Sequence, residues 1–317
     1  MPRVRSQPAP FLVPRAPGWT IPRRMVLATV AVVLLGAALH LWWAFTGDFS
    51  GLAFFYAYPG AVFLVVVVTL GAAWSWRAWR QFAPGDALRG AWLGIALAAS
   101  CQSLGYILAH WLSRPTYLNP FRGWAVAHPA AAVAVHTAGL EISGTLEMAA
   151  LAAGLAVVLR AYRRVGLLRR LAAWEWLCAA LLAAYTGHVL YVVARVQTAP
   201  SAPPVTLAAV LDWLNNPLLA ILLIEVLLLR RGVVAMRWGL IARCWGSLAL
   251  AIGLTAAGSV LMWAVDFSYI RWPWSSLTWY VWFPAAAAYA LAPAYQLQAA
   301  AVARRQLARA RAARAAS

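Results

Sequence analysis

The sequence predicts an all-α fold, a polytopic transmembrane helical bundle of eight spans with both termini in the cytoplasm. Two observations predict it: the apolar composition and the distribution of arginine. The chain has 317 residues, 64% of them hydrophobic, and a mean hydropathy of +0.73, far from the balance of a soluble domain. A bilayer core of about 30 Å requires about 20 apolar residues per helix. The apolar runs of that length are residues 25–46, 51–76, 88–112, 129–159, 171–196, 206–229, 240–265 and 275–300.

The basic residues indicate the orientation of these spans. All 26 are arginine, and 22 of them fall in the two tails and in the segments after the second, fourth and sixth runs. Only Arg114, Arg122, Arg195 and Arg271 fall in the alternate loops. Short loops rich in Arg stay in the cytoplasm, so the sequence predicts a multi-pass protein of the bacterial inner (plasma) membrane. The net charge of +18 is then explained by topology and by anionic lipid headgroups at the cytoplasmic face, and nucleic acid is not an expected partner.

The apolar runs leave no room for a soluble domain. Residues 1–24 are rich in Pro and Arg and predict a disordered basic N-terminal tail. Residues 25–300 form the eight-helix transmembrane domain. Residues 301–317 are mostly Ala and Arg, both strong helix formers, and predict a basic cytoplasmic helix that continues the last span.

The odd-numbered spans indicate repeated helical hairpins, formed by spans 3–4, 5–6 and 7–8. In each of spans three, five and seven a Trp precedes a Gly by the same separation; the pairs are Trp92 and Gly105, Trp174 and Gly187, and Trp245 and Gly258. Trp anchors a helix at the membrane interface, and a Gly about 20 Å further along the axis permits a close helix contact. We therefore expect all three glycines at helix–helix contacts.

Polar and ionisable residues gather in the outer third of the predicted bundle. An ionisable side chain at membrane depth indicates a functional site, because burial of its charge is costly. Helical phase places His136, Ser143 and Glu147 on one stripe of span four. The sequence therefore predicts an outward-facing polar cavity walled by spans three to six. Its candidate residues are Gln102, His110, His136, Ser143, Glu147, Tyr185, His188, Asp212 and Asn216.

Glu147 is the central candidate of this set. It lies roughly 20 Å along its helix from Arg160, within the hydrocarbon, where snorkelling cannot carry its carboxyl group to water. We therefore expect Glu147 to face the bundle interior, either protonated or paired with Asn216 or Gln102.

Three functions fit such a cavity. The preferred interpretation is the binding of a small molecule of unknown identity, in a sensor-like protein or in an accessory subunit with a partner membrane subunit. The first alternative is a haem- or metal-binding protein, with His40, His136 and His188 as weak candidate ligands, although the chain has no CxxCH, HxxxH or HExxH motif. The second is a lipid- or isoprenoid-modifying enzyme with His136 or His188 as its base, although the chain has no DxxxD or HxxxxD motif. The sequence assigns no catalytic residue.

Overall fold

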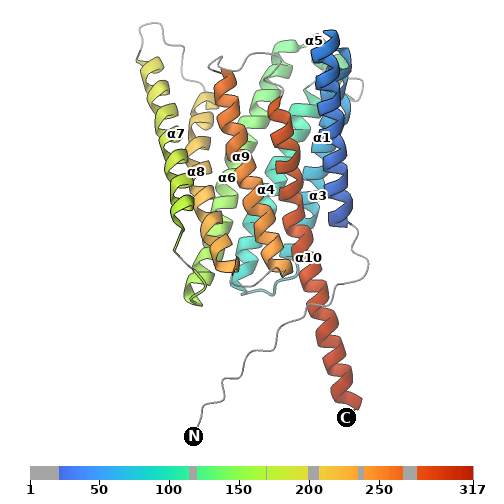
Figure 1. The fold of residues 1–317 in the computed structure, drawn as a ribbon, viewed down its shortest axis with the longest axis vertical. Helices are drawn as coiled ribbons and strands as arrows, with labels where there is room; N and C mark the ends of the chain where they lie inside the picture. The colour runs from blue at the N-terminus through green and yellow to red at the C-terminus, as the bar shows by residue number, and fades with distance from the viewer. Residues whose placement is uncertain are drawn as a thin grey trace.

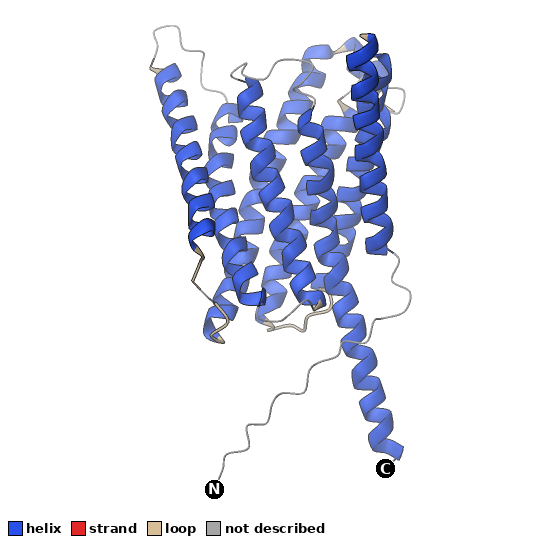
Figure 2. Ribbon diagram, in the orientation of Figure 1, coloured by secondary structure: helices blue, strands red, loops and turns tan. Residues whose placement is uncertain are grey.

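The computed structural model describes residues 21–113, 120–168, 170–198, 207–234, 239–266 and 277–316. Every regular element in these residues is helical, and the long helices run side by side in one bundle (Figures 1 and 2). The predicted all-α class is therefore confirmed. Of the predicted N-terminal tail, residues 1–20 lie outside the described residues, and the first helix begins at Ile21.

The helices follow the predicted apolar runs closely. In chain order they are α1 (Ile21–Thr46), α2 (Ser50–Phe55), η1 (Tyr56–Gly60), α3 (Ala61–Trp79), α4 (Ala87–Tyr106), η2 (Ile107–Leu112), α5 (Arg122–Ala127), α6 (Pro129–Arg164), α7 (Ala173–Gln197), α8 (Leu207–Val234), α9 (Leu240–Asp266) and α10 (Trp279–Ala316). The segments α2, η1 and α3 form one rod whose π-helical part contains Pro59, because proline has no N–H for the regular α-helical ladder.

The ends of the helices have local causes. The Asp86 side chain accepts a hydrogen bond of 2.8 Å from the backbone N–H of Leu88 and caps α4. Pro129 occupies the first turn of α6, where its missing N–H costs nothing. Beyond the last residue of α6, Gly166 adopts a φ of +69°, a conformation that glycine reaches without steric strain.

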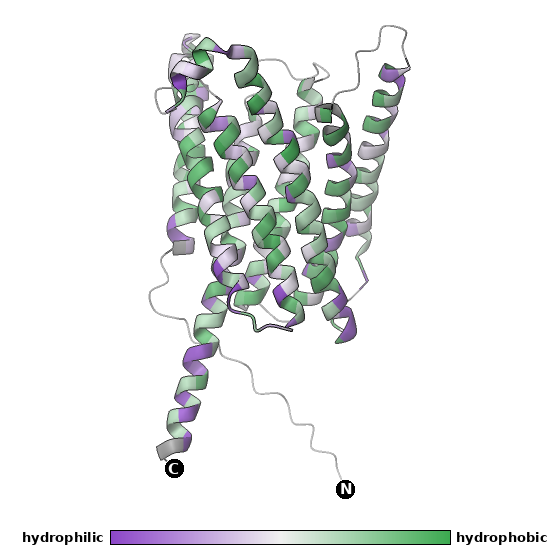
Figure 3. Ribbon diagram, turned by 180° about the vertical axis from the view of Figure 1, so that it is seen from behind, coloured by the Kyte–Doolittle hydropathy of each residue, from purple (hydrophilic) through white to green (hydrophobic). Residues whose placement is uncertain are grey.

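Seven helices of the described chain are long and apolar enough to cross a membrane. They are Pro22–Thr46, Ser50–Trp79, Ala87–Leu112, Pro129–Arg164, Ala173–Gln197, Trp213–Val233 and Leu240–Val265. They correspond to the first seven predicted spans, so the chain is a multi-pass membrane protein. Hydrophilic residues lie mainly at the helix ends and on the projecting part of α10 (Figure 3).

The last helix, α10, is the most enclosed part of the bundle. Its residues from Phe283 to Ala294 are almost all buried, and it packs against α1, α3 and α9. The same helix continues beyond the other helices as an exposed arginine-rich rod (Figure 1). A helix surrounded by protein has little contact with lipid, so α10 can carry Pro284, Pro293 and several Tyr and Trp residues.

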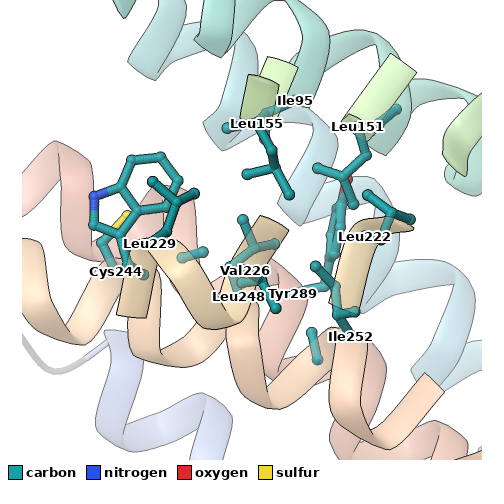
Figure 4. Packing of buried hydrophobic residues seen from close by; sticks show 14 of the residues in the cluster. Ile95, Leu151, Leu155, Leu222, Val226, Leu229, Cys244, Leu248, Ile252 and Tyr289 are labelled. Carbon is teal, nitrogen blue, oxygen red and sulfur yellow. The ribbon is translucent and has the colours of Figure 1, made fainter. Parts of the chain in front are cut away.

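A packed hydrophobic cluster fills the half of the bundle near the arginine-rich segments. It joins side chains of α4, α6, α8, α9 and α10, including Trp92, Leu155, Val226 and Trp245. Figure 4 shows this packing, in which Leu151, Leu222 and Tyr289 belong to the same cluster. A second cluster joins α10 to α1, α2, η1 and α3. The interior at this end is therefore filled by side chains.

Two of the three glycines in the predicted repeat lie at close helix contacts, and the repeat itself stays a prediction. A Cβ at Gly105 would overlap the Ser143 side chain, and one at Gly258 would lie 2.8 Å from the Trp282 ring, so both glycines are at close helix contacts. The expectation is wrong for Gly187, where a Cβ would meet nothing within 4 Å. The reason is that α7 lies at the edge of the bundle, where α8 is the helix that packs along it (Figure 1).

Candidate functional site

A cavity of about 810 Å³ lies above the packed cluster, toward the end of the bundle opposite the arginine-rich segments. Residues of α4, η2, α6, α7, α8, α9 and α10 line it. Its polar lining consists of Gln102, Tyr106, His110, His136, Glu141, Glu147, Tyr185, Asn215, Asn216, Thr255, Ser259, Thr278 and Tyr289. Leu151, Leu222, Ile252 and Tyr289 belong both to this lining and to the packed cluster, so the cluster forms the floor of the cavity.

Glu147 and Gln102 meet across the contact between α4 and α6. Gln102 Nε2 donates a hydrogen bond of 2.9 Å to Glu147 Oε1. The two helices approach closely because a Cβ at Gly94 would lie 2.8 Å from the Cα of Gly154. The structure thus brings together the pair expected from the cost of burying the Glu147 carboxyl group. Asn216, the other candidate partner, lines the same cavity.

Two polar groups near Glu147 have no partner among the described residues. Both Gln102 Oε1 and the hydroxyl of Tyr289 are buried without a hydrogen bond. Tyr289 lines the cavity while only 5% exposed, and it lies within electrostatic range of the Glu147 carboxyl group. Buried polar groups are normally hydrogen-bonded, so these two atoms are available to a molecule in the cavity.

A second carboxylate, Glu141, lines the cavity from another face of α6. Asn215 Nδ2 donates to Glu141 Oε2 over 3.4 Å, and Thr145 Oγ1 donates to Asn215 Oδ1 over 2.8 Å. Helical phase directs Glu141 well away from the stripe of Glu147, so the sequence did not predict it as a lining residue. Both carboxylates nevertheless line the cavity, because it reaches more than one face of α6.

Two candidate histidines lie together in the lining. The rings of His110 and His136 are 6.1 Å apart between centroids. His136 Nδ1 lies 2.8 Å from the backbone oxygen of Ala109, and a carbonyl can only accept, so this nitrogen carries a proton and donates. The hydrogen bond ties α6 to η2. His110 packs against Tyr106 and Trp279 at centroid distances of 5.2 and 5.4 Å.

Two other candidates do not line the cavity. Ser143 is buried in the contact between α4 and α6, where its hydroxyl donates to the Gly139 backbone oxygen of its own helix. His188 is exposed on α7, with its ring edge against Trp263. Both positions differ from the expected cavity wall, because the helical phase of a single helix does not show which neighbouring helix covers a face; a role of either residue in ligand binding stays a prediction. Tyr185 does line the cavity, and its hydroxyl donates to the Ser259 backbone oxygen over 3.3 Å. The side chain of Asp212 lies outside the described residues.

The candidate metal ligands lie in separate surroundings. His40 is buried on α1, and its Nδ1 lies 2.6 Å from the hydroxyl of Tyr280 on α10. His136 and His188 contact other residues, as described above. Within the described ranges, no group of three or more His, Cys, Asp and Glu side chains could hold a metal ion.

Aromatic side chains of α9 and α10 form a wall that the sequence did not predict. Trp263, Trp279 and Trp282 line the cavity together with Tyr106, Tyr185 and Tyr289. The predicted walls, spans three to six, are therefore incomplete. The aromatic run at residues 279–282 is the sequence signal that could have indicated α10.

Another carboxylate, Glu175, lies outside the cavity at the arginine-rich end. Its side chain is 0% exposed and accepts from Arg230 Nη1 at 3.3 Å and from Arg231 Nε at 2.5 Å. It also accepts a hydrogen bond of 2.8 Å from the backbone N–H of Ala172, before the first turn of α7. Glu175 thus joins the beginning of α7 to the end of α8.

Comparison with protein-family models, curated proteins and solved structures gives no match for this chain. Similarity therefore assigns neither a family nor a function.

Proposed function

We propose that this chain is an eight-span protein of the bacterial inner membrane that binds a small molecule in an outward-facing cavity, as a sensor-like protein or an accessory membrane subunit. The observation that carries the proposal is the cavity of about 810 Å³ with two carboxylates, two histidines and two asparagines in its lining. Ligand sites are typically of this volume, with a few polar groups among apolar and aromatic walls.

The eighth span in this proposal is α10. It is long enough to cross a bilayer and packs beside α1, α3 and α9. With α10 included, each arginine-rich segment falls on one side, which the positive-inside rule makes cytoplasmic. The cavity then lies toward the outer side, and the arginine-rich end of α10 can contact anionic headgroups or a partner subunit.

Binding rather than transport is supported by what lies below the cavity. The packed cluster that includes Trp92, Leu155 and Trp245 occupies the bundle between the cavity floor and the arginine-rich end. In this conformation, a molecule bound near Glu147 has packed apolar side chains beneath it.

Reporter fusions test the topology. A reporter fused after Arg164 and one fused after Ala316 should both read as cytoplasmic, and one fused after Thr198 as external. A C-terminal fusion that reads as external would exclude α10 as a span. A cytoplasmic reading after Thr198 would contradict the whole arrangement.

Thiol labelling tests the outward cavity. In a background with Cys101→Ala, Cys178→Ala and Cys244→Ala, Thr255→Cys places a thiol in the lining of α9. The membrane-impermeant cation MTSET should modify it from outside in right-side-out vesicles. The matched control is Leu248→Cys, about two turns away on the same helix, where the native side chain is 1% exposed in the packed cluster. Equal modification of both thiols, or modification of Thr255→Cys only from the cytoplasmic side, would overturn the proposal.

A further inference from the structure

We infer that the ligand class of this cavity is an organic cation, an amine with an apolar or aromatic body, and that Glu147 is its counter-ion. This inference rests on the proposed binding function and specifies its ligand. It follows from three independent properties of the cavity: its charge, its unpartnered polar atoms and its aromatic wall.

The charge of the lining is opposite to that of the chain. The chain carries a net charge of +18, yet Glu141 and Glu147 line the cavity, and none of the arginines that the structure describes does. The described hydrogen-bond partner of the Glu147 carboxylate is the neutral amide of Gln102. An amide donor satisfies part of a carboxylate's hydrogen-bonding capacity without cancelling its charge. A cation in the cavity would supply the missing opposite charge.

The unpartnered atoms require a hydrogen-bond donor. Gln102 Oε1 can only accept a hydrogen bond, and the Tyr289 hydroxyl can accept one. Both side chains line the cavity beside Glu147. An ammonium group has three donors and no acceptor, so it could serve Glu147, Gln102 and Tyr289 together. A carboxylate or phosphate ligand would instead place its oxygens against the Glu147 carboxylate and Gln102 Oε1, which can only accept, and only the Tyr289 hydroxyl could donate to it.

The aromatic wall fits the rest of such a ligand. The aromatic side chains that line the same space are Tyr106, Trp263, Trp279, Trp282 and Tyr289. Aromatic rings attract cations through the negative potential of their faces, and they also pack against apolar groups. The floor, which includes Leu151 and Leu222, is apolar. An amine with an aromatic or alkyl body matches both parts of the lining.

A set of three matched fluorescent probes tests the inference with the full chain in nanodiscs of zwitterionic lipid. Dansylcadaverine carries a primary amine, dansyl-5-aminopentanol a neutral hydroxyl, and dansyl-6-aminohexanoate a carboxylate. Binding is measured as energy transfer from tryptophan to the dansyl group, with empty nanodiscs subtracted. The amine should bind roughly tenfold or more tightly than either counterpart, as expected when one charge-assisted interaction of about 1.4 kcal/mol is lost.

Three variants locate the effect. Glu147→Gln should reduce amine affinity by roughly tenfold and leave the affinity for the alcohol unchanged, because the amide keeps an acceptor but no charge. Glu147→Asp keeps the charge and should restore part of the preference for the amine. Gly144→Leu is the blocking control: Gly144 lines the cavity, and a Cβ there meets only Asn215 Nδ2, at 4.0 Å. The leucine should therefore occupy the cavity and abolish binding of every probe.

The possible failures are distinguishable. Equal or tighter binding of the carboxylate or the alcohol would overturn the cation inference, as would an amine affinity that Glu147→Gln does not change. The proposed binding function would survive either result, provided that Gly144→Leu still abolished the signal. If no probe distinguishes the wild-type chain from Gly144→Leu, the binding function and the inference both fail. Gel filtration of each variant shows whether it is folded. Glu141→Gln is a second variant, which removes the charge of the other carboxylate in the lining.

Discussion

Glu147 and Glu175 are both enclosed by a membrane bundle, yet the protein treats them in opposite ways. Glu175 is fully buried, and two arginines and a backbone N–H satisfy it. Glu147 receives one hydrogen bond, from a neutral amide, and lines a cavity. The role of a carboxylate at membrane depth can therefore be inferred only when the groups that pair with it are known. The protein supplies the counter-ions of Glu175, which makes that residue structural; it supplies no described cation at Glu147, the residue that we propose as the counter-ion of a ligand.

The side chains around Glu175 and Glu147 also differ in whether they find partners within the protein. Arg230, which pairs with Glu175, also lies 5.3 Å from the ring centroid of Trp174, so charge and aromatic contacts are satisfied within the protein. Around Glu147, Gln102 Oε1 and the Tyr289 hydroxyl remain without a partner among the described residues. The protein itself therefore satisfies the Glu175 carboxylate, whereas it leaves polar atoms beside Glu147 without a described partner.

The largest expected effect comes from removing the partners of Glu175. The double change Arg230→Met and Arg231→Met leaves a fully buried carboxylate without a cation, which should lower the free energy of unfolding by about 3–5 kcal/mol. Thermal unfolding in detergent measures the loss. Adding Glu175→Gln should recover much of it, because the uncompensated charge disappears. If the double change leaves the melting temperature unaltered, Glu175 is not the structural carboxylate of this comparison.

A smaller loss is expected where α4 meets α6, the contact that holds Gln102 against Glu147. A Cβ at Gly94 would lie 2.7 Å from the Ala150 backbone oxygen, so Gly94→Ala should force the helices apart and cost about 1–3 kcal/mol. Gly90→Ala is the matched control on the same helix, because its Cβ would meet only Val157 Cγ1, at 4.0 Å. Thermal unfolding of the two variants should differ clearly. Equal melting temperatures would mean that the close approach is not required.

The smallest effect on stability is expected at Glu147 itself. Glu147→Gln keeps an oxygen that accepts from Gln102 Nε2 and removes an unpaired charge, so the free energy of unfolding should change by less than about 1 kcal/mol. The same substitution at Glu175 removes the charge from two ion pairs and should therefore destabilise the protein more than Glu147→Gln does. A Glu147→Gln variant less stable than Glu175→Gln in thermal unfolding would reverse the assignment of roles.

The sequence predicted the properties that are set within a single helix, such as its position in the chain and the cost of a charge on it. Seven apolar runs were sufficient to predict seven helices, and the cost of an isolated charge predicted that Glu147 has a polar partner. The sequence did not predict contacts set by neighbouring helices. Gly187 has the same spacing as Gly105 and Gly258, but α7 lies at the edge of the bundle, so its glycine contacts nothing.

The candidate site shows the same limit. Helical phase relates Ser143 to Glu147 correctly, but Gly105 of α4 covers Ser143 and separates it from the cavity. From the sequence alone, Glu175 appears only as a residue at the membrane boundary. Arg230 and Arg231 follow it by 55 and 56 residues, and only tertiary packing brings them to its carboxylate. The sequence did not predict the aromatic wall of α9 and α10, because the expected cavity was inferred from the polar residues of spans three to six alone.

The negative charge that we propose for the cavity should control the reactivity of a thiol placed inside it. Thr255→Cys is placed in the background that lacks the three native cysteines, and its rates of modification by cationic MTSET and anionic MTSES are measured. Each rate is divided by the rate at which the same reagent modifies 2-mercaptoethanol in solution. We expect the normalised rate for MTSET to exceed that for MTSES roughly tenfold or more. Glu147→Gln and Glu141→Gln together should lower this ratio of rates toward one. A normalised ratio of one or less with both carboxylates in place would contradict the account.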